Sequence, residues 1–190
     1  MMPGYALIGA WVLWLASWLA AALWADPAAT RPAGREQFLY RAATLAGAVL
    51  LFLQRGQVFG GASLWDLSRG AQWALVVVAV LGLAFTWWAR LYLGRLWSSS
   101  VTKKADHYVV DTGPYAIVRH PIYTGIIAAI FATAILKATP TAIPGALLMT
   151  LGFWIKARLE EQFLRDQLGA DAYDSYRRNV PMLMPFGPKG

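Results

Sequence analysis

The chain has 190 residues, of which 58% are hydrophobic and 14% charged, whereas soluble domains carry about 25% charged residues. The apolar residues form runs too long for the helices of a soluble protein, which indicates an integral membrane protein. The net charge is +7 and there is no cysteine, so disulfides, cysteine-ligated metals and a catalytic thiol are excluded.

Five apolar stretches are candidates for transmembrane helices. The first has no preceding Lys or Arg and is longer than a signal-peptide core, so we interpret it as a retained helix. Arg90, near the end of the third stretch, is free to extend toward the interface. The last two are separated by a few residues, which predicts a tight antiparallel hairpin. The stretches are residues 5–25, 39–53, 71–93, 122–136 and about 140–155.

We therefore expect an all-α integral membrane protein with about five transmembrane helices and a C-terminal cytosolic helical extension. No G-x-G-x-x-G motif follows a strand pattern, so no Rossmann domain is expected. The expected parts are three transmembrane helices over 1–93, a cytosolic connector over 94–121, a transmembrane hairpin over 122–155 and cytosolic helices over 156–190.

The basic residues indicate an orientation. With the N-terminus outside, residues 26–41, 90–121 and 156–190 lie inside and hold nearly all of the Lys and Arg, as cytoplasmic segments do. Most of the net charge is then explained without nucleic acid. Because the composition resembles that of bacterial proteins, we predict a multi-pass inner-membrane protein with a cytoplasmic C-terminus. The exceptions outside are Arg55, Arg69 and Lys137.

Polar residues concentrate in two inner segments, 103–125 and 156–186, which flank the predicted hairpin and so lie side by side. Pro121 suits the first turn of a helix. His120 and Tyr123 then lie at a helix N-terminus, where free N–H groups and the helix dipole favour an anion. The alternative is that His120 is a helix-capping or interface histidine.

The second polar segment extends the fifth apolar stretch as a helix to about Leu168, where Gly169 ends it. Asp171 is expected to cap a short following helix. The residues that share one face of that helix are Tyr173, Tyr176 and Val180.

Lys156 and Glu160 are four residues apart and can meet on the helix surface. Glu160 and Glu161 lie about one turn beyond the last apolar residue, near the membrane interface. The alternative to a functional site is a solvated pair of glutamates with one ordinary surface ion pair.

Two motifs give a resemblance to a known family. Residues 113–125 match GPYxxxRHPxYxG, and residues 160–181 match EExxL…G…Y..Y…VP. Together they resemble the isoprenylcysteine carboxyl methyltransferase family and the related membrane phospholipid N-methyltransferases, over roughly residues 90–186.

The resemblance implies an integral membrane methyltransferase that uses S-adenosylmethionine and releases S-adenosylhomocysteine. Its site would be cytosolic, with Glu160 accepting from the ammonium group or ribose hydroxyls of the cofactor and Arg95 facing the substrate head group. No resident metal is expected. The other cofactor-binding residues implied are His107, Tyr108, Val109, Val110, Tyr115, His120, Pro121 and Tyr123.

The acceptor decides which residues are catalytic. A carboxylate is already ionised at neutral pH and needs no base, so Arg95 or Lys156 would orient it. An amine needs a proton acceptor, for which Glu161 and Tyr123 are the candidates. The partners expected are the bilayer and a lipophilic acceptor that enters from it, such as an isoprenoid, fatty or lipid-like acid. The sequence carries no signal of oligomeric state.

Three alternatives remain open. A phospholipid N-methyltransferase shares the cofactor site but methylates an amine. A membrane sterol reductase has a similar helical core but binds a nicotinamide cofactor. A small transporter or assembly protein would carry charges inside its spans, whereas the polar residues here gather at one interface.

Overall fold

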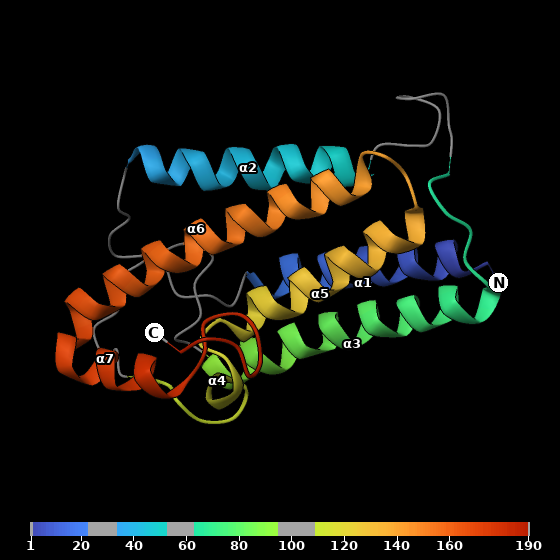
Figure 1. Cartoon of the computed structure of the whole chain (residues 1–190). Coiled ribbons are helices and arrows are strands. Elements are labelled where there is room, and N and C mark those ends of the chain that lie inside the picture. The colour runs from blue at the N-terminus through green and yellow to red at the C-terminus, as the bar shows by residue number, and fades with distance from the viewer. Residues whose placement is uncertain (1, 23–33, 53–62, 95–108, 190) are drawn as a thin grey trace.

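The computed structural model describes residues 2–22, 34–52, 63–94 and 109–189 (Figure 1). Within these ranges the chain is helical, and its only β-structure is an isolated antiparallel bridge between Pro181 and Lys189. The expected all-α fold without a Rossmann domain is confirmed for these residues. The helices are α1 (Pro3–Ala22), α2 (Arg35–Phe52), α3 (Arg69–Leu93), α4 (Pro114–Ile117), α5 (Pro121–Lys137), α6 (Ala142–Leu168) and α7 (Ala170–Asn179).

Among the described helices, α1, α3 and α6 are long and apolar enough to cross a membrane, and α5 is a shorter apolar helix of 17 residues. The predicted continuation of the last apolar stretch to Leu168 is confirmed, because α6 is one helix of 27 residues. Such a helix is about 40 Å long, against a hydrocarbon core of about 30 Å. The last turns of α6 therefore extend beyond the thickness of an apolar layer.

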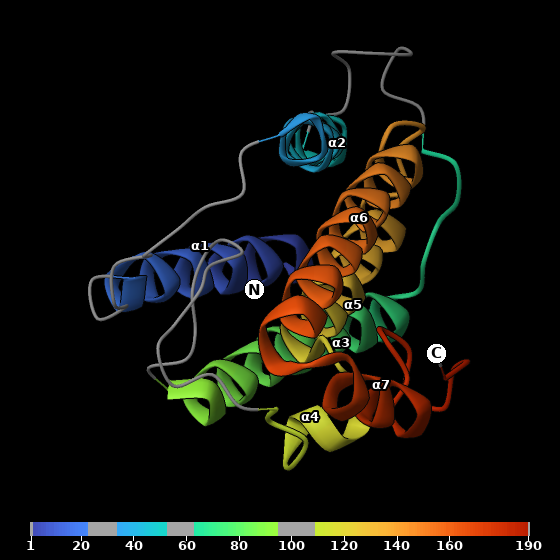
Figure 2. The same ribbon diagram turned by 90° about the vertical axis from the view of Figure 1, so that its left-hand side faces the viewer.

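The long helices run side by side (Figure 1). At one end of the bundle, which we call the polar end because the ion pairs described below lie there, α2 and α5 begin and α3 and α6 end. The helices α4 and α7 and the C-terminal segment also lie there (Figures 1 and 2). The predicted α5–α6 hairpin is present: a left-handed residue, Ala138, ends α5 at the opposite end of the bundle.

Packing between helices depends on close backbone contact. Helix α3 packs along α5, and α2 packs along α6. A Cβ atom on Gly82 of α3 would lie only 2.6 Å from the carbonyl oxygen of Gly125 of α5, and one on Gly47 of α2 would lie 2.7 Å from that of Gly145 of α6. Because only glycine fits such contacts, the two helices of each pair can approach one another closely.

Helix α1 is attached through its tryptophans. Trp11 donates through Nε1 to Thr133 Oγ1 (2.9 Å), and Trp14 donates to Thr86 Oγ1 (2.7 Å). Each indole thus packs against the apolar core and places its polar N–H on a hydroxyl of α3 or α5. These contacts fix the rotation of α1 against the bundle.

The prediction that Arg90 extends freely toward the interface is wrong. Its side chain is buried, with 7% of the residue exposed, and it donates to the carbonyl oxygen of Ala21 (2.6 Å). Its guanidinium also lies 4.7 Å from the centre of the Trp18 ring. The last carbonyls of α1 lack helical partners, and the indole face attracts a cation. These two interactions hold the Arg90 side chain against α1.

A single glycine ends α6 as predicted: Gly169 has φ 89° and separates α6 from α7. The expectation that Asp171 caps α7 is wrong, because α7 already begins at Ala170 and Asp171 lies inside its first turn with no capping hydrogen bond. The predicted apolar face of α7 is confirmed by the cluster of Tyr173, Tyr176 and Val180.

Candidate active site

The site forms where α5 begins, between α6 and the C-terminal segment. The backbone N–H groups of Arg119 and His120 donate to the carbonyl oxygens of Pro181 (2.8 Å) and Met182 (3.1 Å). The Thr124 hydroxyl donates to the carbonyl oxygen of Leu183 (2.6 Å). The N–H groups of Arg119 and His120, just ahead of α5, are therefore occupied by carbonyl oxygens of the C-terminal segment.

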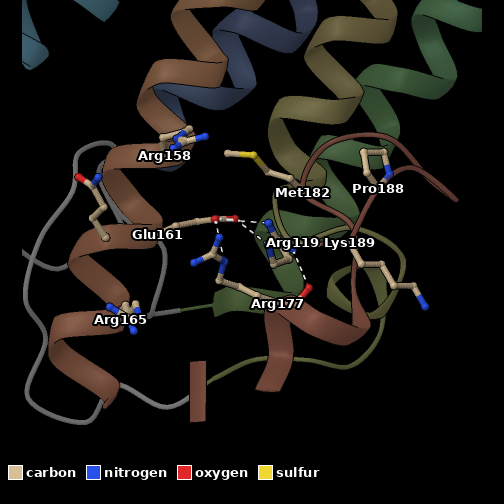
Figure 3. Close-up of a pocket in the computed structure, with 9 residues that line it drawn as sticks. Arg119, Arg158, Glu161, Arg165, Arg177, Met182, Pro188 and Lys189 are labelled. Atoms are coloured by element: carbon tan, nitrogen blue, oxygen red, sulfur yellow. Dashed lines mark hydrogen bonds and ion pairs between the residues drawn. The ribbon is translucent and has the colours of Figure 1, made fainter. Parts of the chain in front are cut away.

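A buried ion pair joins α5 to α6. Arg119 Nε lies 2.6 Å from Glu161 Oε1, and both side chains are less than a tenth exposed. Arg119 also donates through Nη1 to the carbonyl oxygen of Val180, and Arg177 of α7 lies 3.6 Å from the second Glu161 oxygen (Figure 3). One carboxylate thus holds together α5, α6 and α7, and the alternative of a solvated glutamate pair is wrong for Glu161.

His120 lies between the two glutamates. Its Nε2 is 3.3 Å from Glu161 Oε1, and its Nδ1 is 3.6 Å from Glu160 Oε2. Its ring stacks on that of Tyr123, with centroids 5.4 Å apart and planes inclined by 9°. The side chain makes no capping hydrogen bond to α5. The imidazole is therefore oriented by carboxylates and an aromatic ring, so the simple capping alternative does not describe it.

Glu160 is the more accessible carboxylate, with a side chain 19% exposed. It accepts a hydrogen bond from the Tyr123 hydroxyl (2.6 Å) and lies 3.8 Å from Lys156 Nζ. The predicted meeting of Lys156 and Glu160 is confirmed. The same ammonium lies 5.1 Å from the centre of the Tyr123 ring and 6.0 Å from that of Tyr40. A carboxylate, a cation and aromatic faces therefore meet at one place.

Tyr40 of α2 was missed from the sequence, where it lies far from both motifs. It is buried, with 6% exposed. Phe153 of α6 was also missed, and its ring lies 5.3 Å from that of Tyr123. A signal for Tyr40 was present in principle, since it is an aromatic residue near the start of an apolar stretch, but nothing in the sequence paired α2 with α6.

Tyr115 occupies a different position from the other predicted residues. Its hydroxyl donates to the carbonyl oxygen of Ala89 (3.4 Å), and its own carbonyl oxygen accepts from the Tyr176 hydroxyl (2.7 Å). Burial raises the pKa of both phenols, which keeps them neutral donors. Tyr115 thereby ties α4 to α3 and α7.

The remaining predicted residues divide between the described and undescribed parts of the chain. Pro121 is buried at the first position of α5. Val109 packs against the Tyr173 cluster, and Val110 is partly buried. Arg95, His107 and Tyr108 lie outside the described residues. Within the described ranges, no group of three or more His, Asp and Glu side chains could hold a metal ion.

Comparison with known proteins finds a family model that matches the central segment. Residues 74–166 match the sequence model of the Isoprenylcysteine carboxyl methyltransferase (ICMT) family. This segment contains the whole 113–125 motif together with Glu160 and Glu161, so the resemblance inferred from the motifs is confirmed there.

Three relatives illustrate the range of the similarity. A methanethiol S-methyltransferase of a Pseudomonas species is 42% identical over 71 residues, which are 37% of this chain and 26% of that protein. A protein-S-isoprenylcysteine O-methyltransferase of Schizosaccharomyces pombe is 33% identical over 106 residues, which are 53% of this chain and 43% of that protein. The match thus spans less than half the length of either relative.

The third relative matches over a greater length. The nickel-cobalt-cadmium resistance protein NccN of Alcaligenes xylosoxydans xylosoxydans is 26% identical over 161 residues, which are 84% of this chain and 72% of that protein. Among solved structures, the eukaryotic intramembrane Ras methyltransferase ICMT superposes with a TM-score of 0.54 at 24% identity, covering 77% of this chain and 52% of that one. The chain therefore has an ICMT-like fold.

Proposed function

We propose that this chain is an integral membrane methyltransferase that uses S-adenosylmethionine and acts on a lipophilic acceptor. The observation that carries the proposal is that His120 and Tyr123 of the first motif meet Glu160 of the second motif and the neighbouring Lys156, all within the matched family segment. The proposed reaction is carboxyl O-methylation of an isoprenoid- or lipid-like acid.

The donor set fits the cofactor. S-Adenosylmethionine carries an ammonium group, a carboxylate and ribose hydroxyls, and it supplies a methyl group activated by a sulfonium. The Glu160 carboxylate can accept from the ammonium or hydroxyl groups of the cofactor. The neighbouring faces of Tyr123 and Tyr40 already attract one cation, Lys156, and suit a sulfonium for the same electrostatic reason.

Positioning is the main contribution expected from these residues. Methyl transfer requires the nucleophile, the methyl carbon and the sulfur to be in line, so a fixed site can supply much of the rate enhancement. Glu161 holds His120 at 3.3 Å and Arg119 at 2.6 Å, and His120 in turn stacks on Tyr123. We assign Glu161 to this positioning, because its oxygens already contact Arg119, His120 and Arg177.

The same contacts bear on the choice of acceptor. A proton acceptor for an amine substrate must offer a free lone pair, and the Glu161 oxygens face three cationic or donor groups. The Tyr123 hydroxyl already donates to Glu160. A carboxylate acceptor needs no base, so this arrangement favours it over an amine. Lys156, with Arg95 of the undescribed connector, is proposed to orient the acceptor.

We further propose five membrane spans, namely α1, α2, α3, α5 and α6, with the polar end in the cytoplasm of a bacterial inner membrane. Support comes from the charges: Arg35, Arg119 and Lys156 lie at the polar end, while Arg69 and Lys137 lie at the other end, as the positive-inside rule requires.

The acceptor is proposed to enter from the bilayer between the polar ends of α1 and α2. Helix α2 reaches the site through Tyr40, which faces Lys156. Its contact with α1, between Trp11 and Phe52 (6.0 Å), is at the last residue of α2, far from the site. The cofactor, being water-soluble, would enter from the cytoplasmic side.

A thiol acceptor is the second candidate, favoured by the 42% identity to a methanethiol S-methyltransferase. The test is transfer of a labelled methyl group from S-adenosylmethionine by the purified protein in lipid nanodiscs. Farnesylated and fatty carboxylates, a short thiol and phosphatidylethanolamine are offered separately. Labelled ester is expected, and labelled thioether alone would assign the second candidate.

Glu160→Gln is the inactive variant in this assay, and Arg178→Gln is the matched control, since Arg178 is an exposed cation of α7 outside the site. Labelled phosphatidylethanolamine alone would assign phospholipid N-methylation. No transfer to any acceptor, with no binding of S-adenosylhomocysteine, would reject the methyltransferase and leave a non-enzymatic membrane protein. Binding of NADPH would indicate the reductase alternative.

A further inference from the structure

A strongly basic pocket is lined in part by the Arg119–Glu161 pair. It has a volume of about 370 Å³ and opens between the late turns of α6 and the C-terminal segment (Figure 3). Neither Lys156, Glu160 nor Tyr123 lines it. The lining residues are Arg119, Arg158, Glu161, Gln162, Arg165, Arg177, Met182, Pro188 and Lys189.

The charges of this pocket are unbalanced. Five of its lining residues are cationic and one is anionic, and the Glu161 carboxylate is already shared by Arg119 and Arg177. Arg165 is paired with Asp174 outside the pocket lining. Within the described part of the chain, no carboxylate pairs with Arg158 or Lys189. The pocket therefore holds excess positive charge, and an anion entering it would be stabilised.

One residue that lines the pocket, Arg177, also has an unsatisfied hydrogen-bond donor. Arg177 Nε is buried and has no hydrogen-bond partner among the described residues, and the nearest Glu161 oxygen is 3.6 Å away. A buried donor without a partner is costly. An oxyanion with several acceptor oxygens could accept from this group and from Arg158 together, as phosphate commonly does with arginines.

The surroundings of the pocket are those of a membrane interface. Arg158 lies over the ring of Trp154 (5.1 Å), which is 42% exposed on the same helix. The turn between the lining residues Met182 and Pro188 carries two exposed apolar side chains, Met184 (70% exposed) and Phe186 (fully exposed). Thr124 holds the base of this turn one helical turn inside α5.

An apolar turn beside a ring of cations is suited to a bilayer, where the side chains contact acyl chains and the cations lie at the level of the phosphates. We propose that this pocket binds a phosphate group, and that its source is the head group of an anionic membrane lipid. Arg158 and Lys189 supply the uncompensated charge, and Arg177 supplies the donor at the floor.

The test uses the full-length protein in detergent, with phosphatidylglycerol as the probe. Native mass spectrometry measures the phosphatidylglycerol retained, with phosphatidylcholine as the zwitterionic control lipid. The variants are Arg158→Gln, Lys189→Gln and their combination. Arg178→Gln, outside the pocket, is the control with the same charge change as each single variant. Since Arg158 and Lys189 are exposed, these changes are expected to preserve the fold, which circular dichroism checks.

Retention of phosphatidylglycerol is expected to fall by at least about fivefold in the double variant, since charge-assisted contacts are lost, and to be unchanged in Arg178→Gln. Arg158→Lys should keep most of it. A second arm titrates inorganic phosphate at constant ionic strength. Binding of phosphate in that arm without retention of the lipid would support the phosphate site and reject the lipid as its source.

Two results would overturn the proposal. One is equal retention of phosphatidylglycerol by the double variant and by Arg178→Gln, which would show that Arg158 and Lys189 do not bind the lipid. The other is competition between S-adenosylhomocysteine and the anion for the same pocket, which would make the pocket part of the cofactor site. If methyl transfer fails, lipid retention and phosphate binding can still be measured, because neither measurement depends on turnover.

Discussion

Two neighbouring parts of the α5 helix make opposite kinds of contact. In its second turn, α5 meets α3 backbone to backbone at Gly82 and Gly125, with no room for a single added carbon. At its start, the contacts are made by long charged side chains, with Arg119 reaching Glu161 of α6 and the carbonyl oxygens of Arg177 and Val180. The first contact depends on the absence of side chains, and the second depends on long charged side chains.

The difference shows that two kinds of contact have different roles along one helix. Contacts between glycines fix the helix axes closely, because backbone atoms cannot change rotamer. Charged side chains can change rotamer, so they fix the positions of helices less closely. A buried charge that loses its partner is strongly destabilising. The close apolar contacts therefore hold α5 where its first residues can meet two glutamates at hydrogen-bond distances.

The largest effect is expected from Glu161→Gln. The change leaves Arg119 buried without a full counter-charge, which should cost about 3–5 kcal/mol and lower the melting temperature by about 6–20 °C. Thermal unfolding in detergent, followed by circular dichroism, measures it. The double replacement Arg119→Met with Glu161→Leu removes both charges and should recover much of the loss. A melting temperature unchanged in Glu161→Gln would show that the pair does not hold the polar end together.

The glycine contact is expected to be the next most sensitive. Gly82→Ala places a Cβ atom 2.6 Å from the Gly125 carbonyl oxygen, so α3 and α5 must separate, at a cost of about 1–3 kcal/mol. Gly9→Ala in α1 is the matched control, because no atom lies within 4 Å of its added Cβ. Equal melting temperatures for the two variants would contradict the account of this contact.

Tyr123→Phe separates the two roles of that side chain. The stacking on His120 is kept, while the hydrogen bond to the Glu160 carboxylate (2.6 Å) is lost. A hydrogen bond to a charged group contributes about 1.5–3 kcal/mol, so affinity for S-adenosylhomocysteine should fall by about tenfold or more. Calorimetric titration measures it, with the melting temperature as the control. Unchanged affinity would remove Tyr123 from the proposed cofactor site.

Lys156→Gln should have a smaller effect on the fold. It removes a cation lying over the rings of Tyr123 and Tyr40, which contributes about 0.5–1 kcal/mol at such sites. The Michaelis constant for a carboxylate acceptor should rise, and Lys156→Arg should restore it in part. If acceptor binding is the same in all three proteins, Lys156 does not orient the acceptor.

The smallest effect is a pH dependence at the surface. A hydrogen bond from Arg165 holds the pKa of the Asp174 carboxyl below its usual value. Its contribution to stability is therefore present above about pH 3.9 and is lost as the pH falls through the lowered pKa. The difference in melting temperature between the wild type and Asp174→Asn should shrink in that acid range. A constant difference down to lower pH would contradict it.

The sequence predicted the elements better than the contacts between them. Pro121 and Gly169 mark real helix boundaries because each acts through its own backbone. The spacing of Lys156 and Glu160 predicted their meeting, because one helix carries both. By contrast, Tyr40 reaches the site only because α2 packs along α6, and Arg90 is buried only because α1 ends beside it. Such contacts depend on packing between distant segments, which local patterns do not contain.

The C-terminal segment illustrates the same limit. Its Val180-Pro181 pair was part of a recognised motif, but the pairing of Pro181 and Met182 with the N–H groups ahead of α5 was not predictable from that motif. This pairing occupies the N–H groups of Arg119 and His120. Backbone partners of this kind have no side-chain signature.

Calorimetric titration of the detergent-purified protein with S-adenosylhomocysteine tests the central claim most directly. The account predicts saturable binding to the wild type and to Arg178→Gln, with a loss of at least about tenfold in Glu160→Gln, because the accessible carboxylate of the cluster is removed. Equal binding by Glu160→Gln and the wild type, in samples with the same circular dichroism spectrum, would contradict it and place the cofactor elsewhere in the molecule.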